Sequence, residues 1–77
     1  MKEKTILLNS IQDVKEFVNI VNKYDFEVDL ISGRYAVNAK SIMGIFSLDL
    51  SKKILLQAHT SEDSPFFEEI NQFVSKD

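Results

Sequence analysis

The sequence predicts an α+β fold with one four-stranded antiparallel sheet and three helices over one of its faces. Segments with strand-like and helix-like hydrophobic spacing follow one another in the order βαββαβα, and such an order is expected to form two layers around a core. The chain has 77 residues, 44% of them hydrophobic and 27% charged. That size and composition predict one folded domain, which we place at residues 1–77.

The chain is expected to begin with a short strand and a long helix. The strand is predicted at Lys2–Leu8, because a short apolar run there ends in the polar pair Asn9-Ser10. Ser10 followed three residues later by Asp13 predicts a capping box, with Asp in place of the usual Glu. The helix is predicted at Ile11–Tyr24, because its apolar residues recur at helical spacing: Ile11, Val14, Phe17, Val18, Ile20 and Val21.

A hairpin is expected next. Apolar residues alternate with acidic residues in Phe26–Leu30, which is the pattern of a half-buried strand. The pair Ser32-Gly33 supplies a turn, and a second strand is predicted at Tyr35–Val37.

The rest of the chain predicts a short helix, a strand and a last helix. Ser41 begins the apolar segment Ile42–Leu50, in which Gly44 lowers helix propensity by about 1 kcal/mol relative to alanine, so this helix should be short and dependent on packing. A strand rich in Ile and Leu is predicted at Ile54–His59. Pro65 suits the first turn of the last helix, whose apolar stripe comprises Phe66, Phe67, Ile70, Phe73 and Val74.

The composition excludes several classes of function. The net charge of -3 comes from 12 acids and 9 bases without a basic block, so we expect no direct binding to nucleic acid or to an anionic membrane surface. The chain has no cysteine, which excludes disulfides and thiolate chemistry and is compatible with a cytoplasmic location. The first residues lack the apolar run of a signal peptide or a membrane span, so membrane insertion is not expected.

The most specific signal is the segment Asn38-Ala39-Lys40-Ser41-Ile42-Met43-Gly44. Together with its surroundings it closely resembles the regulatory-serine segment of HPr, the phosphocarrier protein of the bacterial sugar phosphotransferase system. The resemblance implies an HPr-like open-faced β-sandwich with strand order 1-4-2-3. In HPr proteins of low-GC Gram-positive bacteria, an ATP-dependent kinase phosphorylates the serine of this motif, and the product acts as corepressor for a catabolite-control transcription factor. The resemblance therefore implies a regulatory phosphorylation site at Ser41.

The physical chemistry at Ser41 is compatible with that role. A serine that begins a helix accepts from free N–H groups of the first turn, and a phosphate there meets the positive end of the helix dipole. Phosphorylation adds about -1.5 to -2 charge beside an apolar surface, and the basic side chains of Arg34 and Lys40 lie close enough in sequence to help recognise it. The alternative is that Ser41 only caps the helix.

The same helix predicts a docking surface. HPr relatives dock partners with apolar side chains of this helix, and Ile42, Met43 and Phe46 lie where those residues would fall. The apolar residues of this segment nearly encircle the helix axis, so some are expected to face solvent and mark an interface. The partner-binding residues that we expect are Gln12, Lys15, Lys40, Ile42, Met43 and Phe46.

The phosphoryl-accepting histidine of the resembling family has no counterpart here. In HPr it lies in a Gly-hydrophobic-His-Ala-Arg-Pro segment before the first helix, whereas this chain reads Asn9-Ser10-Ile11-Gln12-Asp13. Alignment without a gap places Ser10 at the histidine, Gln12 at the arginine and Asp13 at the proline. A serine phosphate is a stable ester, the balancing cation is missing, and the added carboxylate repels phosphate. We expect no phosphorelay through this site and no catalytic residue.

Few other residues are candidates for chemistry. His59 is the only histidine and is expected to be structural or exposed, without a Cys or second His to complete a zinc site. The acidic pair Glu62-Asp63 is more typical of favourable charge before the last helix than of a metal site. The sequence contains neither a phosphate-binding glycine loop nor a nucleophile with a base nearby. We expect no metal, no cofactor and no enzymatic activity.

Three functional hypotheses follow. The leading one is an HPr-like regulatory module without carrier activity, similar to catabolite-repression HPr homologues; its partners would be an HPr kinase, a catabolite-control transcription factor or phosphotransferase components. The second is a phosphocarrier with a displaced acceptor, for which His59 is the sole candidate. The third is a drifted domain that binds an unrelated partner through the same apolar face. A monomer and a strand-exchanged dimer are both compatible with a first strand at the sheet edge.

Overall fold

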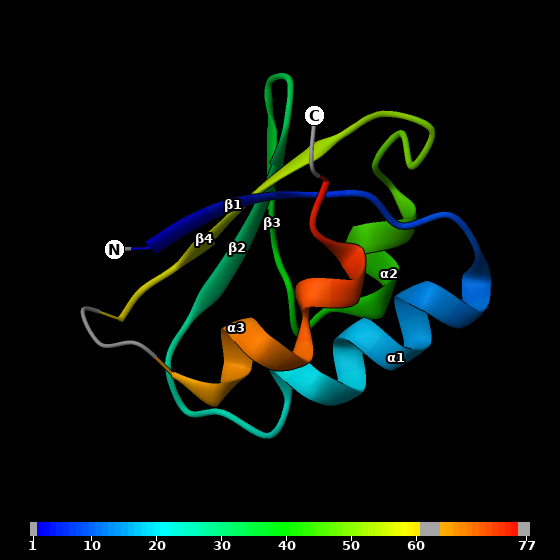
Figure 1. Cartoon of the computed structure of the whole chain (residues 1–77). Coiled ribbons are helices and arrows are strands. Elements are labelled where there is room, and N and C mark those ends of the chain that lie inside the picture. Colours follow the sequence, from blue (N-terminus) through cyan, green and yellow to red (C-terminus); the bar gives the residue numbers. More distant parts are fainter. Residues whose placement is uncertain (1, 61–63, 76–77) are drawn as a thin grey trace.

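The computed structural model describes residues 2–60 and 64–75, and shows an open sheet covered on one face by helices (Figure 1). The four strands lie in the order β1-β4-β2-β3, and all neighbouring strands are antiparallel. This arrangement confirms the predicted fold class and strand order. The acidic pair Glu62-Asp63 lies outside the described residues. The elements are β1 (Lys2–Ile6), α1 (Ile11–Val21), β2 (Val28–Ser32), β3 (Tyr35–Asn38), α2 (Ile42–Phe46), β4 (Ile54–Ala58), α3 (Pro65–Glu69) and a 3-10 turn, η1 (Asn71–Phe73).

A hydrophobic core lies between the sheet and the helices. Every second residue of β4 is buried and the residues between them are partly exposed, as expected for a strand with one covered face. Helix α1 buries Val14, Phe17 and Val21 at helical spacing, as the sequence pattern predicted. The sheet contributes Ile6, Val28, Leu30, Ile54, Leu56 and Ala58 to this core, all of them fully buried.

Two elements in the first half are shorter than predicted. Helix α1 ends at Val21 instead of Tyr24, because the N–H groups of Lys23 and Tyr24 bond to carbonyls only three residues back, which tightens the chain into a turn. Strand β1 ends at Ile6, and the N–H of Leu7 donates to the carbonyl of Phe73, 2.8 Å away, instead of to β4.

The C-terminal segment is a broken helix. Helix α3 ends at Glu69, and the N–H of Phe73 donates to the carbonyl of Ile70 at 2.8 Å, which is the three-residue spacing of a 3-10 turn. This tighter turn buries Phe73 and brings Val74 into an antiparallel bridge with Ile6. The second half of the outer edge of β1 is therefore covered by the chain's own C-terminal segment, which reduces its availability for pairing with another chain.

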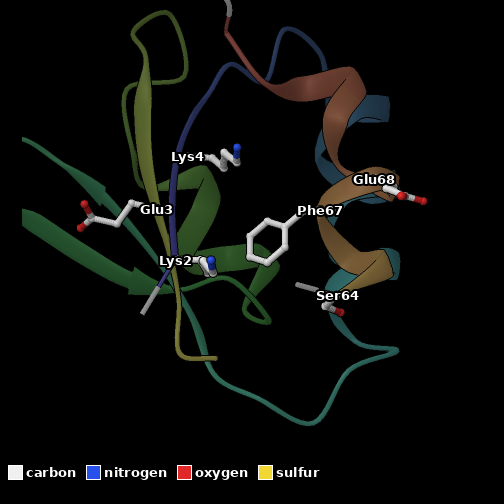
Figure 2. Close-up of a pocket in the computed structure, with 6 residues that line it drawn as sticks. All are labelled: Lys2, Glu3, Lys4, Ser64, Phe67 and Glu68. Atoms are coloured by element: carbon white, nitrogen blue, oxygen red, sulfur yellow. The ribbon is translucent and has the colours of Figure 1, made fainter. Parts of the chain in front are cut away.

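A hollow of about 410 Å³ separates β1 from α3 (Figure 2). Phe67 of α3 points toward β1, where Lys2 and Lys4 lie on the helix-covered side, while Glu3 points to the opposite side. Since side chains alternate along a strand, β1 divides its charged residues between the two faces of the sheet. Glu3 accepts a hydrogen bond from the side chain of Gln57 on the neighbouring strand, with Oε2 and Nε2 2.7 Å apart.

Glu69 ties the end of α1 to α3. Its carboxylate forms an ion pair with Lys23 and accepts from the Tyr24 hydroxyl. The hydrogen bonds from Lys23 and then Tyr24 hold the pKa of Glu69 below its ordinary value of 4.5. The same bond, with desolvation and the negative charge of Glu69, raises the pKa of Tyr24 above 10.0.

These contacts predict a pH-dependent contribution to stability. Because the pKa of Glu69 is lowered in the folded state, its contribution is complete above pH 4.5 and is lost as the pH falls through the folded-state pKa. Glu69→Gln should therefore lower the midpoint of urea unfolding at neutral pH, with a difference from wild type that shrinks in acid. Glu68→Gln, which removes the same charge from an exposed neighbour, is the control. Parallel stability curves for wild type and Glu69→Gln below pH 4.5 would contradict the assignment.

Candidate functional site

Ser10 begins α1 as its N-cap. Its Oγ accepts from the N–H of Asp13 at 3.1 Å, and Asp13 Oδ2 accepts from the N–H of Asn9 at 3.0 Å. The reciprocal cap predicted from this pair is present, although the carboxylate takes the N–H of Asn9 instead of that of Ser10. The positive end of the helix thus already holds a carboxylate, which occupies a place where an incoming phosphate would need donors.

The side chain of Gln12 is directed along the helix. Its Nε2 lies 3.4 Å from Glu16 Oε1, and both residues are exposed. Gln12 stands where the resembling family has its arginine, and here it supplies no positive charge to Ser10. Lys15 is also exposed on α1. The side chains of Gln12 and Lys15 are therefore exposed on α1, and Gln12 supplies no guanidinium at the helix entrance.

An apolar hollow of about 470 Å³ adjoins Ser10, between the start of α1 and the end of α2. Ile11 is 64% exposed, which corrects its predicted place in the buried stripe of α1. Ile11 is the first residue of the helix, and it lines the hollow together with Phe46 of α2. The hollow is lined by Leu8, Asn9, Ser10, Ile11, Phe46, Leu50 and Ser51. Sequence periodicity assigned Ile11 to the core and therefore missed it as a surface residue.

Helix α2 presents apolar side chains to solvent. Met43 is 76% exposed and Phe46 is 40% exposed, while Ile42 is partly exposed. Ile45 is fully buried and anchors the helix to the core. The expectation that part of this helix faces outward is confirmed, and Phe46 connects its exposed side to the hollow beside Ser10.

Ser41 is exposed and is the N-cap of α2. Its Oγ accepts from the N–H of Gly44 at 3.2 Å. A Cβ added at Gly44 would lie 3.2 Å from Ser41 Oγ and 3.3 Å from Val37 Cβ, so a larger residue would press on this cap. The absence of a side chain at Gly44 therefore leaves room for the Ser41 cap, whereas the sequence indicated only that Gly44 lowers helix propensity.

The turn before Ser41 is held by Asn38, which begins the segment singled out from the sequence, and by Glu27, to which the sequence assigned no role. Asn38 Oδ1 accepts from the N–H of Lys40 at 2.8 Å, and Asn38 Nδ2 donates to Glu27 Oε2 at 2.8 Å. Asparagine at the start of such a turn is a recognisable signal. Glu27 gives no such signal in the sequence, because its partner Asn38 is 11 residues away in the chain.

The basic residues expected near Ser41 are separated. Lys40 directly precedes it and is partly buried. Arg34 lies at the hairpin turn and lines a different hollow, with Ser47 and Lys52. Ser41 begins α2 and Ser47 ends it. Of the two basic residues, Lys40 therefore adjoins Ser41, whereas Arg34 lies near the other end of the helix.

His59 lies at the far end of the sheet from Ser10. Its Nε2 is 2.7 Å from Asp29 Oδ2, and its backbone N–H donates to the carbonyl of Glu27 at 2.8 Å. His59 follows the end of β4 that pairs with Lys2, whereas Ser10 follows the end of β1 at Ile6. The imidazole and the hydroxyl are therefore not brought together.

The part of the chain that the structure describes contains neither a cluster of metal ligands nor a membrane-spanning helix. Across residues 2–60 and 64–75, no group of three or more His, Cys, Asp or Glu side chains is arranged to hold a metal ion. Over the same residues, no helix combines the length and apolar character needed to cross a membrane.

Comparison with known proteins identifies the family and the fold. The family model described as "PTS HPr component phosphorylation site" matches residues 12–76. HPr-C-His from Thermoanaerobacter tengcongensis is 28% identical, with a TM-score of 0.78, over 94% of this chain and 89% of that one. No curated protein matches the chain significantly.

Two Bacillus structures are also similar. The catabolite repression protein Crh of Bacillus subtilis is 30% identical with a TM-score of 0.58, over 90% of this chain and 76% of that one, and it was solved as a swapped dimer. The phosphocarrier protein HPr of Bacillus anthracis is 24% identical with a TM-score of 0.63, over 92% of this chain and 89% of that one, and its likeness is one of fold.

Proposed function

This chain belongs to the PTS HPr family, and from that premise we propose that it is a regulatory, protein-binding member that carries no phosphoryl group between other proteins. Proteins of this family are phosphocarriers and not enzymes, and they work by contact with other phosphotransferase components. The proposal assigns to this chain the protein contacts of its relatives without their transfer chemistry.

The observation that carries the proposal is the cap at the start of α1. Ser10 stands there, and its Oγ accepts from the N–H of Asp13, whose carboxylate in turn accepts from the N–H of Asn9. A phosphoryl group at Ser10 would meet this negative charge and find no cation at Gln12, whose side chain turns to Glu16. A serine ester at this place would also be too stable to pass its phosphoryl group onward.

The proposed working surface is the exposed side of α2. Met43 and Phe46 are accessible, and the apolar hollow next to Phe46 extends this surface to Ile11. Ser41 begins the same helix and its hydroxyl is exposed. A phosphate on Ser41 would add negative charge at the edge of an apolar docking surface, and would thereby change which partner binds.

The proposed partners are an ATP-dependent HPr kinase and a catabolite-control transcription factor that binds the phosphorylated form. Support comes from Crh, a catabolite repression protein that is 30% identical to this chain. In this proposal Gln12, Lys15 and Lys40 border the apolar surface and contribute polar contacts to those partners.

Phosphorylation with an HPr kinase and ATP tests the proposal. We expect wild-type chain to acquire one acid-stable phosphate, as a serine ester is, and Ser41→Ala to acquire none. Ser10→Ala is the matched control, since Ser10 is also an exposed N-cap hydroxyl, and it should be phosphorylated like wild type. Each substitution removes a cap and costs about 1 kcal/mol of stability, so circular dichroism should show both variants folded. Phosphate on Ser10 or on no residue would refute the regulatory role of Ser41.

A further inference from the structure

The turn between β3 and α2 is closed by one asparagine. Asn38 is the last residue of β3, and its backbone carbonyl accepts from the N–H of Ser41 at 3.0 Å. Its side-chain Oδ1 accepts from the N–H of Lys40 at 2.8 Å. Both hydrogen bonds fix the residues that immediately precede α2, and so they set the direction in which the Ser41 side chain leaves the backbone.

Glu27 determines how the amide of Asn38 is oriented. An ionised carboxylate only accepts hydrogen bonds, so Glu27 Oε2 takes the Nδ2 end of the amide, 2.8 Å away, and leaves Oδ1 for Lys40. The backbone carbonyl of Glu27 accepts from the N–H of His59 at 2.8 Å, directly after β4. Glu27 therefore connects the turn that presents Ser41 to the end of β4.

We infer that Asn38 and Glu27 are positioning residues for the phosphorylation of Ser41, an inference that rests on the proposed function. In that reaction Ser41 Oγ forms a bond to the γ-phosphorus of ATP, the bond from that phosphorus to the β–γ bridging oxygen breaks, ADP leaves, and the hydroxyl proton passes to a base of the kinase. In-line attack needs a fixed approach of the hydroxyl, and a displacement of about 1 Å can cost about 100-fold in rate.

Kinetics with purified HPr kinase and ATP test this inference on the full chain. Asn38→Ala removes both side-chain bonds and should lower kcat about tenfold, with KM within about twofold of wild type, because the apolar docking residues of α2 are untouched. Asn38→Asp keeps an acceptor for Lys40 but places a second carboxylate against Glu27, and should also lower kcat. Adding Glu27→Gln supplies an amide donor from the other side, and this double variant should return kcat to within about twofold of wild type.

Gln57→Ala is the matched control. It removes another solvent-accessible bond between an amide and a carboxylate on the same sheet, 2.7 Å long, between Gln57 Nε2 and Glu3 Oε2, and should leave kcat unchanged. Urea unfolding of each variant separates a loss of stability from a loss of positioning. Equal kcat for Asn38→Ala and Gln57→Ala would overturn the inference, and so would a double variant that remains as slow as Asn38→Asp. A wild-type chain that takes up no phosphate would instead overturn the proposed function, and the inference with it.

Discussion

Phe66→Ala is expected to unfold much of the population under conditions in which wild type is stable. Phe66 is fully buried on α3, and its ring centroid lies 5.3 Å from that of Tyr24, 5.4 Å from that of Phe26 and 5.3 Å from that of Phe67. Removal of a buried Phe side chain costs about 3 to 5 kcal/mol, while a domain of this length has a total stability of about 4 to 12 kcal/mol. The measurement is urea unfolding, in which the midpoint should fall by about 3 to 5 M for a slope near 1 kcal/mol/M.

The matched control is Phe46→Ala, which removes the same atoms from a residue that is 40% exposed. Its effect on the unfolding free energy should stay below about 1 kcal/mol, because less area is removed from contact with the core. If Phe66→Ala and Phe46→Ala lowered the unfolding midpoint equally, the burial of Phe66 among its aromatic neighbours would not account for the loss of stability.

Periodicity predicted the parts of the fold that depend on which side of a helix or strand a residue occupies. The alternating burial of β4 and the buried positions Val14, Phe17 and Val21 of α1 follow from backbone geometry alone. The N-caps at Ser10 and Ser41 were predictable for a similar reason, because an N-cap serine and the N–H that it accepts from are only three residues apart. Strand order came from the family resemblance, since hydrophobic pattern does not rank strands within a sheet.

The unpredicted features depend on contacts between residues far apart in the chain. The link from Tyr24 to Glu69 spans 45 residues, and the break of the last helix serves the pairing of Val74 with Ile6. Ile11 has the spacing of a core residue, yet it is exposed because the first turn of α1 lies beside α2. In the candidate site, α2 was therefore identifiable from sequence, whereas the hollow that joins it to α1 required the tertiary structure.

Incubation with phosphoenolpyruvate and the phosphotransferase enzyme that phosphorylates HPr is expected to leave wild-type chain without acid-labile phosphate. The hydroxyl of Ser10 forms only a stable ester, and the carboxylate of Asp13 occupies the start of α1. Transfer to the positive-control variant Ser10→His/Gln12→Arg/Asp13→Pro should be measurable, because it restores the family's histidine, arginine and proline at the helix entrance. Radiolabel that survives base and is lost in acid is the readout.

His59→Asn is the decisive control for this experiment, because His59 is the chain's one histidine. Its imidazole contacts Asp29 at the end of the sheet opposite to Ser10, so an enzyme docked on α2 and the start of α1 would not reach it. Acid-labile label on wild type that disappears in His59→Asn would show a displaced acceptor and contradict the non-carrier proposal. Label confined to the Ser10→His/Gln12→Arg/Asp13→Pro variant would show that the chain still docks the enzyme and that its helix entrance alone prevents transfer.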